Sequence, residues 1–465
     1  ADLAVAENRT DRALAELRGA VGDLRAHKAS FGNLDVQAAT AHVAHLADRG
    51  LCRAVAQGVP AAVFAWAERA RALSARPAPV TAPADPVGAE MLAELHHARD
   101  ALRAGELAGR PDPVLRTRCL ALHRQIRQRT WYPPDPHEPA SPTPLRDVVA
   151  ALGDGTLLVY LAAGGDVYAL AATAHHRRVQ RLGPVGPLHE LHRRWRADLD
   201  ALATGTLPAP LRGAVEAASR GAAERLDDTL LRPLSDLIGE GPLLVAPPAR
   251  LAALPWPLLP SLRGRPVAVE RSPTRWLRVR DAATLPDRPR VTLVAGSGIP
   301  PAAAEVGQVG AVWESAHTLT GPAATTAAVR EAAARADVLH IAAHGAHEPD
   351  NPLFSYLNLV DGRLYGHECG SWARLPRHVV LSACELRAPD TRPGDRASGM
   401  PVALLHGGAG SVVAAVAGIG DEAAHTVIPA YHAALRRGLA PAAALAEVGG
   451  DAAVPCPLVC FGAGW

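Results

Sequence analysis

The chain has 465 residues, which is too long for one ordinary hydrophobic core and predicts two or three domains. Its 48 basic and 46 acidic residues leave a formal charge of +2, so no overall basic field attracts nucleic acid or an acidic membrane surface. Six scattered cysteines do not form the framework of a disulfide-stapled secreted domain, and neither a signal-peptide pattern nor a membrane-spanning apolar run appears. We therefore expect a cytoplasmic protein that binds neither nucleic acid nor membranes directly.

Residues 1–130 have the pattern of amphipathic helices. Apolar residues recur three and four positions apart, for example in residues 12–25, 36–46 and 61–73. Two arrangements fit this pattern: antiparallel helix pairs that resemble a tetratricopeptide array, or an irregular helical bundle. No clean 34-residue period favours the array. The Pro-rich residues 131–145 end the helical pattern and predict a linker between domains.

Strand-like alternation begins after the linker, and we treat residues 146–288 as one unit. Residues 156–163 and 166–172 flank Gly164-Gly165, which predicts a β-hairpin. The Arg-rich stretch that follows is expected to be helical. Further strands are expected at residues 242–247 and 266–271.

The last unit, residues 289–465, alternates strand and helix patterns. Strands are expected near residues 290–296, 338–343, 379–383 and 411–416, with helices near residues 323–336, 400–406, 421–437 and 441–448. Alternation at this spacing predicts a mostly parallel sheet that is covered by helices on both faces.

Two of these strands end in reactive side chains. One apolar run leads to His344 and Gly345, and the other leads to Cys384 and Glu385. Open α/β proteins place their chemistry at the carboxyl ends of the strands, so we expect the histidine and the cysteine to meet at one edge of the sheet. This pair suits a thiolate nucleophile with a histidine base. The backbone N–H groups of Gly345 and Cys384 are the candidate donors to an oxyanion.

A metal site is the competing interpretation, because His340, His344 and His347 are close in sequence and Cys369 follows His367 closely. Within a strand, however, residues four apart lie about 13 Å from one another, which is too far for both to bind one zinc ion. The apolar residues between His340 and His344 favour the strand. We expect no metal or cofactor, and a structural role for His340.

These motifs resemble the CHAT domain, a caspase-like cysteine peptidase module of clan CD that is related to separases and caspases. The specific ones are His340-Ile-Ala-Ala-His344-Gly345 and Val380-Leu-Ser-Ala-Cys384-Glu385. Supporting segments are residues 243–256, the Glu68-Arg69-Ala-Arg71 run, residues 408–413 with Asp421-Glu-Ala423 following, residues 431–435 and residues 460–464.

The resemblance implies an α/β fold with a caspase-like, mostly parallel sheet covered by helices and preceded by an all-α, tetratricopeptide-like region. It implies a cysteine endopeptidase that cleaves a protein substrate with His344 and Cys384 as the dyad. In such proteins the helices sense a regulatory protein partner, and the region before the catalytic half is a degenerate copy of the fold; residues 146–288 fit that role. Members of this family act in bacterial defence and programmed death.

The sequence departs from the family pattern at residues 415–424, where a tryptophan and one acidic residue are replaced. Related peptidases use this segment to line the pocket for the residue before the scissile bond. Asp421 and Glu385 are our candidate substrate-binding residues, and Asp421 would select a basic residue by charge pairing. The alternative for Asp421 is to cap the following helix.

Two hypotheses remain open from the sequence. The first is an active peptidase that is gated by its helical region and whose Arg-containing loop, residues 385–398, is a candidate autocleavage site. The second is a catalytically silent caspase-like scaffold for protein–protein interaction. The presence of both dyad residues favours the peptidase.

Overall fold

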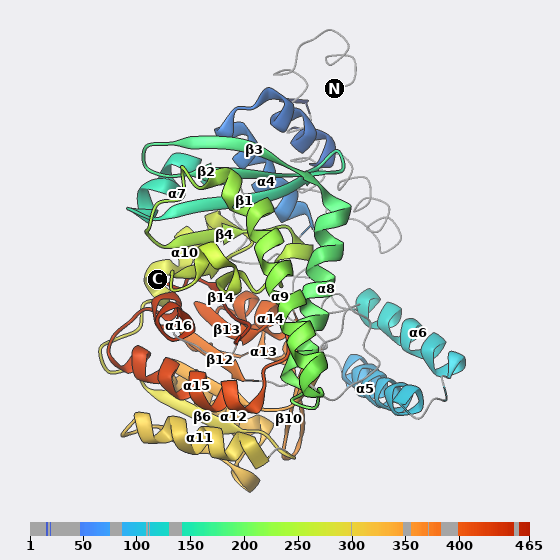
Figure 1. Cartoon of the computed structure of the whole chain (residues 1–465). Helices are drawn as coiled ribbons and strands as arrows, with labels where there is room; N and C mark the ends of the chain where they lie inside the picture. Colours follow the sequence, from blue (N-terminus) through green and yellow to red (C-terminus); the bar gives the residue numbers. More distant parts are fainter. Residues whose placement is uncertain are drawn as a thin grey trace.

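The computed structural model describes residues 47–74, 86–107, 112–129, 142–298, 300–346, 355–370, 372–382, 399–450 and 455–465, together with residues 15, 16, 19 and 110. Within this part of the chain, one mixed sheet has the strand order β3-β2-β1-β4-β5-β14-β13-β12-β8-β6-β7 (Figure 1). Its strands are β1 (Thr156–Ala163), β2 (Asp166–Ala172), β3 (Arg177–Pro184), β4 (Leu243–Ala246), β5 (Val267–Val269), β6 (Val291–Ala295), β7 (His317–Leu319), β8 (Val338–Ala342), β12 (His378–Ser382), β13 (Ser411–Ala415) and β14 (Leu458–Gly462).

The sheet consists of two parallel sets that run in opposite directions. In one set β1, β4, β5 and β14 pair in parallel, and in the other β13, β12, β8, β6 and β7 do so. The sets meet where β14 pairs antiparallel with β13, and β1, β2 and β3 add an antiparallel meander at one end. The carboxyl ends of β8 and β12 therefore lie at the opposite edge from those of β1, β4 and β5.

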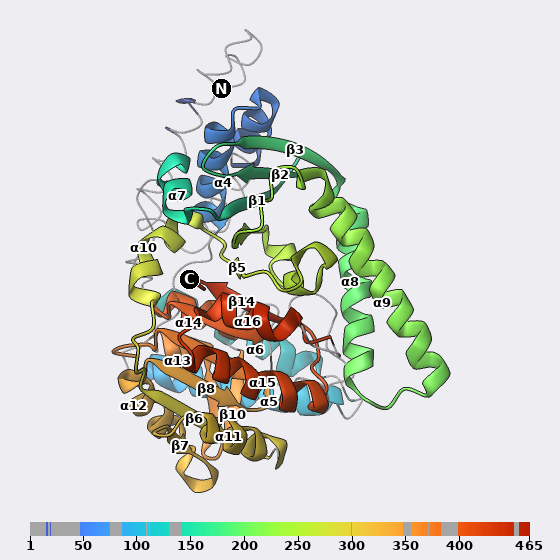
Figure 2. The same cartoon turned by 60° about the vertical axis from the view of Figure 1, so that its left-hand side comes forward.

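Helices cover both faces of the sheet. One face packs against α8 (Val185–Ala203), α9 (Ala209–Leu230), α12 (Thr326–Arg335), α13 (Gly366–Cys369) and α14 (Gly399–His406). The other face packs against α4 (Pro60–Ser74), α7 (Leu145–Leu152) and α10 (Pro273–Ala283) beside the meander, against α11 (Pro300–Val312) and α15 (Asp421–Arg436) beside β6, β8, β12 and β13, and against α16 (Pro441–Gly450) beside β14 and β5. Figure 2 shows α8 and α9 as a long antiparallel pair beside the sheet.

Shorter elements complete the described structure. The 3-10 turns are η1 (Arg232–Leu234), η2 (Ala249–Leu251), η3 (Trp256–Leu258), η4 (Pro260–Leu262) and η5 (Gly321–Ala323). A small antiparallel sheet contains β9 (Gly345–Ala346), β10 (Tyr356–Leu359) and β11 (Gly362–Tyr365).

The described helices before residue 130 pack in two groups. Residues 47–57 and α4 contribute to the core against α7 and the meander. In contrast, α5 (Pro86–Leu107) and α6 (Pro113–Arg129) pair with one another around a small core of their own (Figure 1). The tetratricopeptide-like arrangement stays a prediction, as does the division at residues 130, 145 and 288.

The α/β prediction is confirmed in its main elements. The hairpin forms around Gly164 and Gly165, which both have positive φ angles. The Arg-rich stretch after this hairpin is helical at α8 and α9, as predicted, but residues 177–184 before α8 form the edge strand β3, which was not predicted. Three arginines in this strand break the apolar alternation by which strands were recognised. Charged residues are common on edge strands because they discourage pairing with another chain. The sequence patterns also did not predict α11, β7, β14 or the small sheet.

Candidate functional site: the carboxyl ends of β8 and β12

The strands that carry the predicted dyad are neighbours. β8 and β12 pair in parallel, with Ala342 opposite Ser382 at their carboxyl ends. His344 comes two residues after Ala342 and is half-buried. Cys384 comes two residues after Ser382 in the sequence, but Cys384 and Glu385 lie outside the described residues. The strands thus lead to the same edge in matching register, and the dyad itself stays a prediction.

Gly345 lies where only a glycine fits. The small sheet begins at this residue, which pairs with Leu357, and a Cβ atom added here would lie 2.6 Å from the Tyr356 carbonyl oxygen. The Asn358 N–H donates to the His344 carbonyl at 2.7 Å. This bond makes Gly345 and Leu357 a non-hydrogen-bonded pair of the ladder, so the Gly345 N–H points away from β10. The ladder to β10 therefore does not use the Gly345 N–H, and its role as an oxyanion donor stays a prediction.

A buried polar cluster lies beside the same strand ends. The Ser382 hydroxyl donates to Glu305 Oε2 of α11 at 3.0 Å, and His340 Nε2 lies 3.0 Å from Glu305 Oε1. The His340 ring N–H lies off the line to that oxygen, so this contact is close without being an aligned hydrogen bond. His340 is 0% exposed within β8, in agreement with its expected structural role.

The cluster continues into α15. His432 Nε2 lies 3.2 Å from His340 Nδ1, and the Trp313 indole N–H donates to His432 Nδ1 at 3.1 Å. Burial, with smaller effects from the neighbouring histidines His340 and His378, holds the pKa of His432 well below its usual range.

A second buried group lies at the amino ends of β12 and β13. His378 Nδ1 lies 2.8 Å from the Ser411 hydroxyl, and the Tyr431 hydroxyl lies 2.9 Å from His378 Nε2. Burial lowers the pKa of His378 to about 3, so this ring is neutral.

Sequence reasoning missed most of these polar residues. A signal was available in Ser382 and His378, which are polar residues inside a strand that was expected to be buried on both faces. Their partners could not be deduced, because Glu305 precedes Ser382 by 77 residues and belongs to a helix that was not predicted.

Residues 415–424, where the sequence departs from the family pattern, are held by a hydrogen bond to α8. The Gly418 N–H donates to Asp200 Oδ1 of α8 at 2.7 Å. Gly420 is the N-cap of α15, and Asp421 is the first helical residue. The alternative that Asp421 caps this helix is therefore wrong. Its role in substrate binding stays a prediction.

The Glu68-Arg69-Ala-Arg71 run fastens α4 to the sheet. Arg71 Nη2 donates to the carbonyl oxygens of Tyr160 and Ala246 at 2.9 Å each. Glu68 Oε2 accepts from the Ser272 hydroxyl at 2.7 Å and from the Thr274 N–H at 3.1 Å. This helix therefore contacts the middle of β1, the carboxyl end of β4 and the residues that follow β5.

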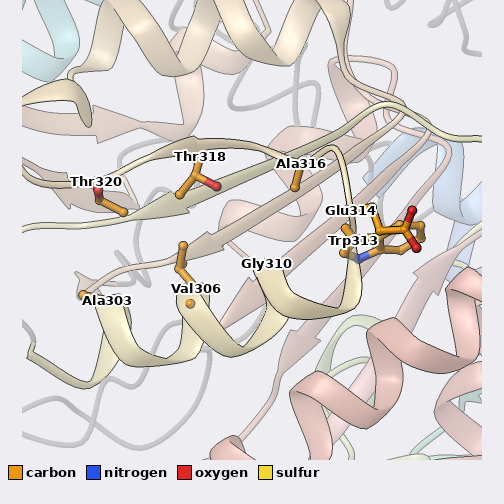
Figure 3. Close-up of a pocket in the computed structure, with 9 residues that line it drawn as sticks. Ala303, Val306, Gly310, Trp313, Glu314, Ala316, Thr318 and Thr320 are labelled. Atoms are coloured by element: carbon orange, nitrogen blue, oxygen red, sulfur yellow. The ribbon is translucent and has the colours of Figure 1, made fainter.

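A cavity of about 370 Å³ lies between α11 and β7 at the outer edge of the sheet (Figure 3). Its lining includes Val306, Gly310, Trp313 and Thr318 but not His344. Among the described residues, no group of three histidine, cysteine or acidic side chains could hold a metal ion. No described helix combines the length and apolar character needed to cross a bilayer.

The comparison with protein families agrees with the motifs. No curated protein matches the chain. Two crystal structures of the Saccharomyces cerevisiae separase–securin complex, at 3.0 and 2.6 Å resolution, are similar to this chain at 8% identity with TM-scores of 0.47 and 0.46. Each alignment covers 98% of this chain and 40% of that chain, so this chain spans less than half the length of these structures. The CHAT domain model matches residues 220–453, about half of the sequence. The chain belongs to the CHAT domain family.

Proposed function

We propose that this protein is a cysteine endopeptidase that cleaves a protein substrate with His344 and Cys384. The single observation that carries the proposal is the parallel register of β8 and β12, in which Ala342 lies opposite Ser382 and each reactive residue follows two positions later. Family membership and the caspase-like α/β fold support the same chemistry.

In the proposed reaction, the Cys384 thiol gives its proton to His344 and the sulfur attacks the carbonyl carbon of the scissile bond. The Gly345 and Cys384 N–H groups bind the oxygen as it becomes negative. His344 then protonates the leaving amine, and an acyl thioester remains on Cys384. Water, which gives a proton to His344, attacks this thioester and releases the new carboxylic acid together with the thiol.

The proposed substrate preference follows from the two acidic candidates of the sequence. Asp421 and Glu385 favour a basic residue before the scissile bond by charge pairing. Under the same preference, Arg387, Arg392 and Arg396 make residues 385–398 a site of autocleavage. A Cys384→Ala variant would not undergo this cleavage, so its migration on a gel is the comparison for wild-type protein.

The helices before the linker are the proposed site of regulation. The contacts of Glu68 and Arg71 attach α4 to the sheet, so a partner protein that displaces α4 would loosen that attachment. This attachment supports gating by a protein partner. The cytoplasm of a bacterium and a defence or death pathway are what the family resemblance implies for the setting.

Peptide-library cleavage by wild type, Cys384→Ala and His344→Ala tests the function. We expect wild type to cut after basic residues and both variants to be inactive. Equal product patterns from all three proteins would refute the peptidase and leave the scaffold function.

A further inference from the structure

A chain of buried polar side chains lies near the carboxyl ends of β8 and β12, and no step of the proposed reaction uses it. Glu305 of α11 contacts Ser382 of β12 and His340 of β8, each at 3.0 Å. His340 contacts His432 of α15, which accepts from Trp313 just after α11. Trp313 lies beyond the last turn of α11 in Figure 3. At most 9% of any of these five side chains is exposed in the core that they share.

The Trp313 indole N–H lies at one end of this series of side chains, and it fixes which ring nitrogen of each histidine carries a proton. An indole N–H can only donate, so His432 Nδ1 must accept. The neutral His432 ring therefore carries its proton on Nε2, which donates to His340 Nδ1. The remaining proton of His340 is then on Nε2, opposite Glu305 Oε1. Glu305 thus contacts both strands: one carboxylate oxygen accepts from the Ser382 hydroxyl, and the other lies close to the His340 N–H without an aligned hydrogen bond.

The two strands contacted by Glu305 are those that lead to the dyad. Ser382 is two residues before Cys384, and His340 is four residues before His344. We propose that Glu305 is a positioning residue of the dyad: its carboxylate holds the ends of β8 and β12 at the relative placement that lets His344 reach the Cys384 sulfur. This inference rests on the proposed function and deepens it.

The other buried serine of this core provides a matched comparison. Ser411 is 0% exposed and its hydroxyl contacts His378, but it lies at the amino ends of the strands, away from the dyad. Removing either hydroxyl leaves one buried polar partner unsatisfied, so the two changes should destabilise the fold similarly. Only the Ser382 change should alter the dyad.

The experiment measures how much His344 accelerates alkylation of Cys384. Full-length proteins are treated with iodoacetamide, and modification of Cys384 is followed by peptide mass spectrometry with and without the His344→Ala change. In wild type we expect His344→Ala to slow alkylation about 100-fold. In the Ser382→Ala background the same change should slow it less than about 10-fold, because a misplaced histidine contributes little. The Ser411→Ala background should keep the wild-type factor.

Changes at Glu305 provide a second, independent test. Glu305→Leu removes both acceptors at similar volume and should reduce the His344 factor as Ser382→Ala does. Glu305→Gln should keep the factor within about threefold of wild type, because the Ser382 hydroxyl can accept from an amide N–H while His340 donates to the amide oxygen. Circular dichroism tests whether each variant is folded. If Ser382→Ala does not fold, the comparison of Glu305→Leu with Glu305→Gln tests the positioning role.

The outcomes distinguish failure of the positioning role from failure of the proposed peptidase function. If His344→Ala does not slow alkylation in wild type, the dyad fails and the positioning role is overturned with it. If the wild-type factor is large and persists in full in Ser382→Ala and Glu305→Leu, the dyad stands and the positioning role is refuted. An equal loss in Ser411→Ala would also refute it, because only general packing would then be involved.

Discussion

Gly345→Ala tests the geometry of the site without removing any polar group. The added Cβ atom would lie 2.6 Å from the Tyr356 carbonyl oxygen and 3.0 Å from Leu357 Cδ2. Ordinary contact begins near 3.4 Å, so β9 and β10 must separate by about 0.8 Å. A misplacement near 1 Å costs about 100-fold in rate when reacting groups are held in position. Alanine keeps the backbone N–H, so this loss would come from displacement alone.

The assay is the rate of peptide cleavage, with thermal unfolding measured on the same samples. We expect a rate decrease of about 100-fold and an unfolding temperature close to that of wild type, because β9 and β10 pair outside the large sheet. Gly239→Ala is the matched control, since an added Cβ there meets no atom within 4 Å. Full activity in Gly345→Ala would refute the role of the β9–β10 contact.

Three further predictions concern stability and specificity. Burial lowers the pKa of His378 to about 3 and that of His192 to about 4, so the unfolded state binds more protons below pH 6.5 and the unfolding temperature should fall from pH 6.5 toward pH 4; a rise on acidification would contradict this. Arg71→Met removes two hydrogen bonds to carbonyl oxygens and should lower the free energy of unfolding by about 3 kcal/mol in urea titrations, whereas an unchanged midpoint would show that α4 is not fastened by this side chain. Asp200→Ala releases the Gly418 N–H and should raise KM for peptides about 10-fold with little change in kcat; a lowered kcat at constant KM would speak against a role in binding.

Much of the fold could be predicted because its strands are buried on both faces. The runs at residues 338–342 and 378–382 are nearly continuous in apolar residues, as expected for parallel strands under helices. β3 was missed because an edge strand needs no apolar face when arginines cover it. β7 has only three residues, two of them exposed, so no periodic signal was available.

Only the site residues that directly follow a predicted strand could be identified from the sequence. The sequence indicated that His344 and Cys384 each follow a buried strand, and the pairing of β8 with β12 confirms that these strands are neighbours. Glu305 could not be identified, because its partners are 35 and 77 residues away and the pairing depends on how α11 crosses the sheet. A polar residue inside an apolar strand indicates that a buried hydrogen-bond partner exists, but the sequence does not show which residue that partner is.

Trapping the acyl-enzyme tests the central claim most directly. Wild-type protein is mixed with a peptide ester that carries a basic residue before the ester bond, quenched in acid and mapped by mass spectrometry. The account predicts an acyl adduct on Cys384 that is absent in Cys384→Ala and strongly reduced in His344→Ala. No adduct, or an adduct on another cysteine, would contradict it.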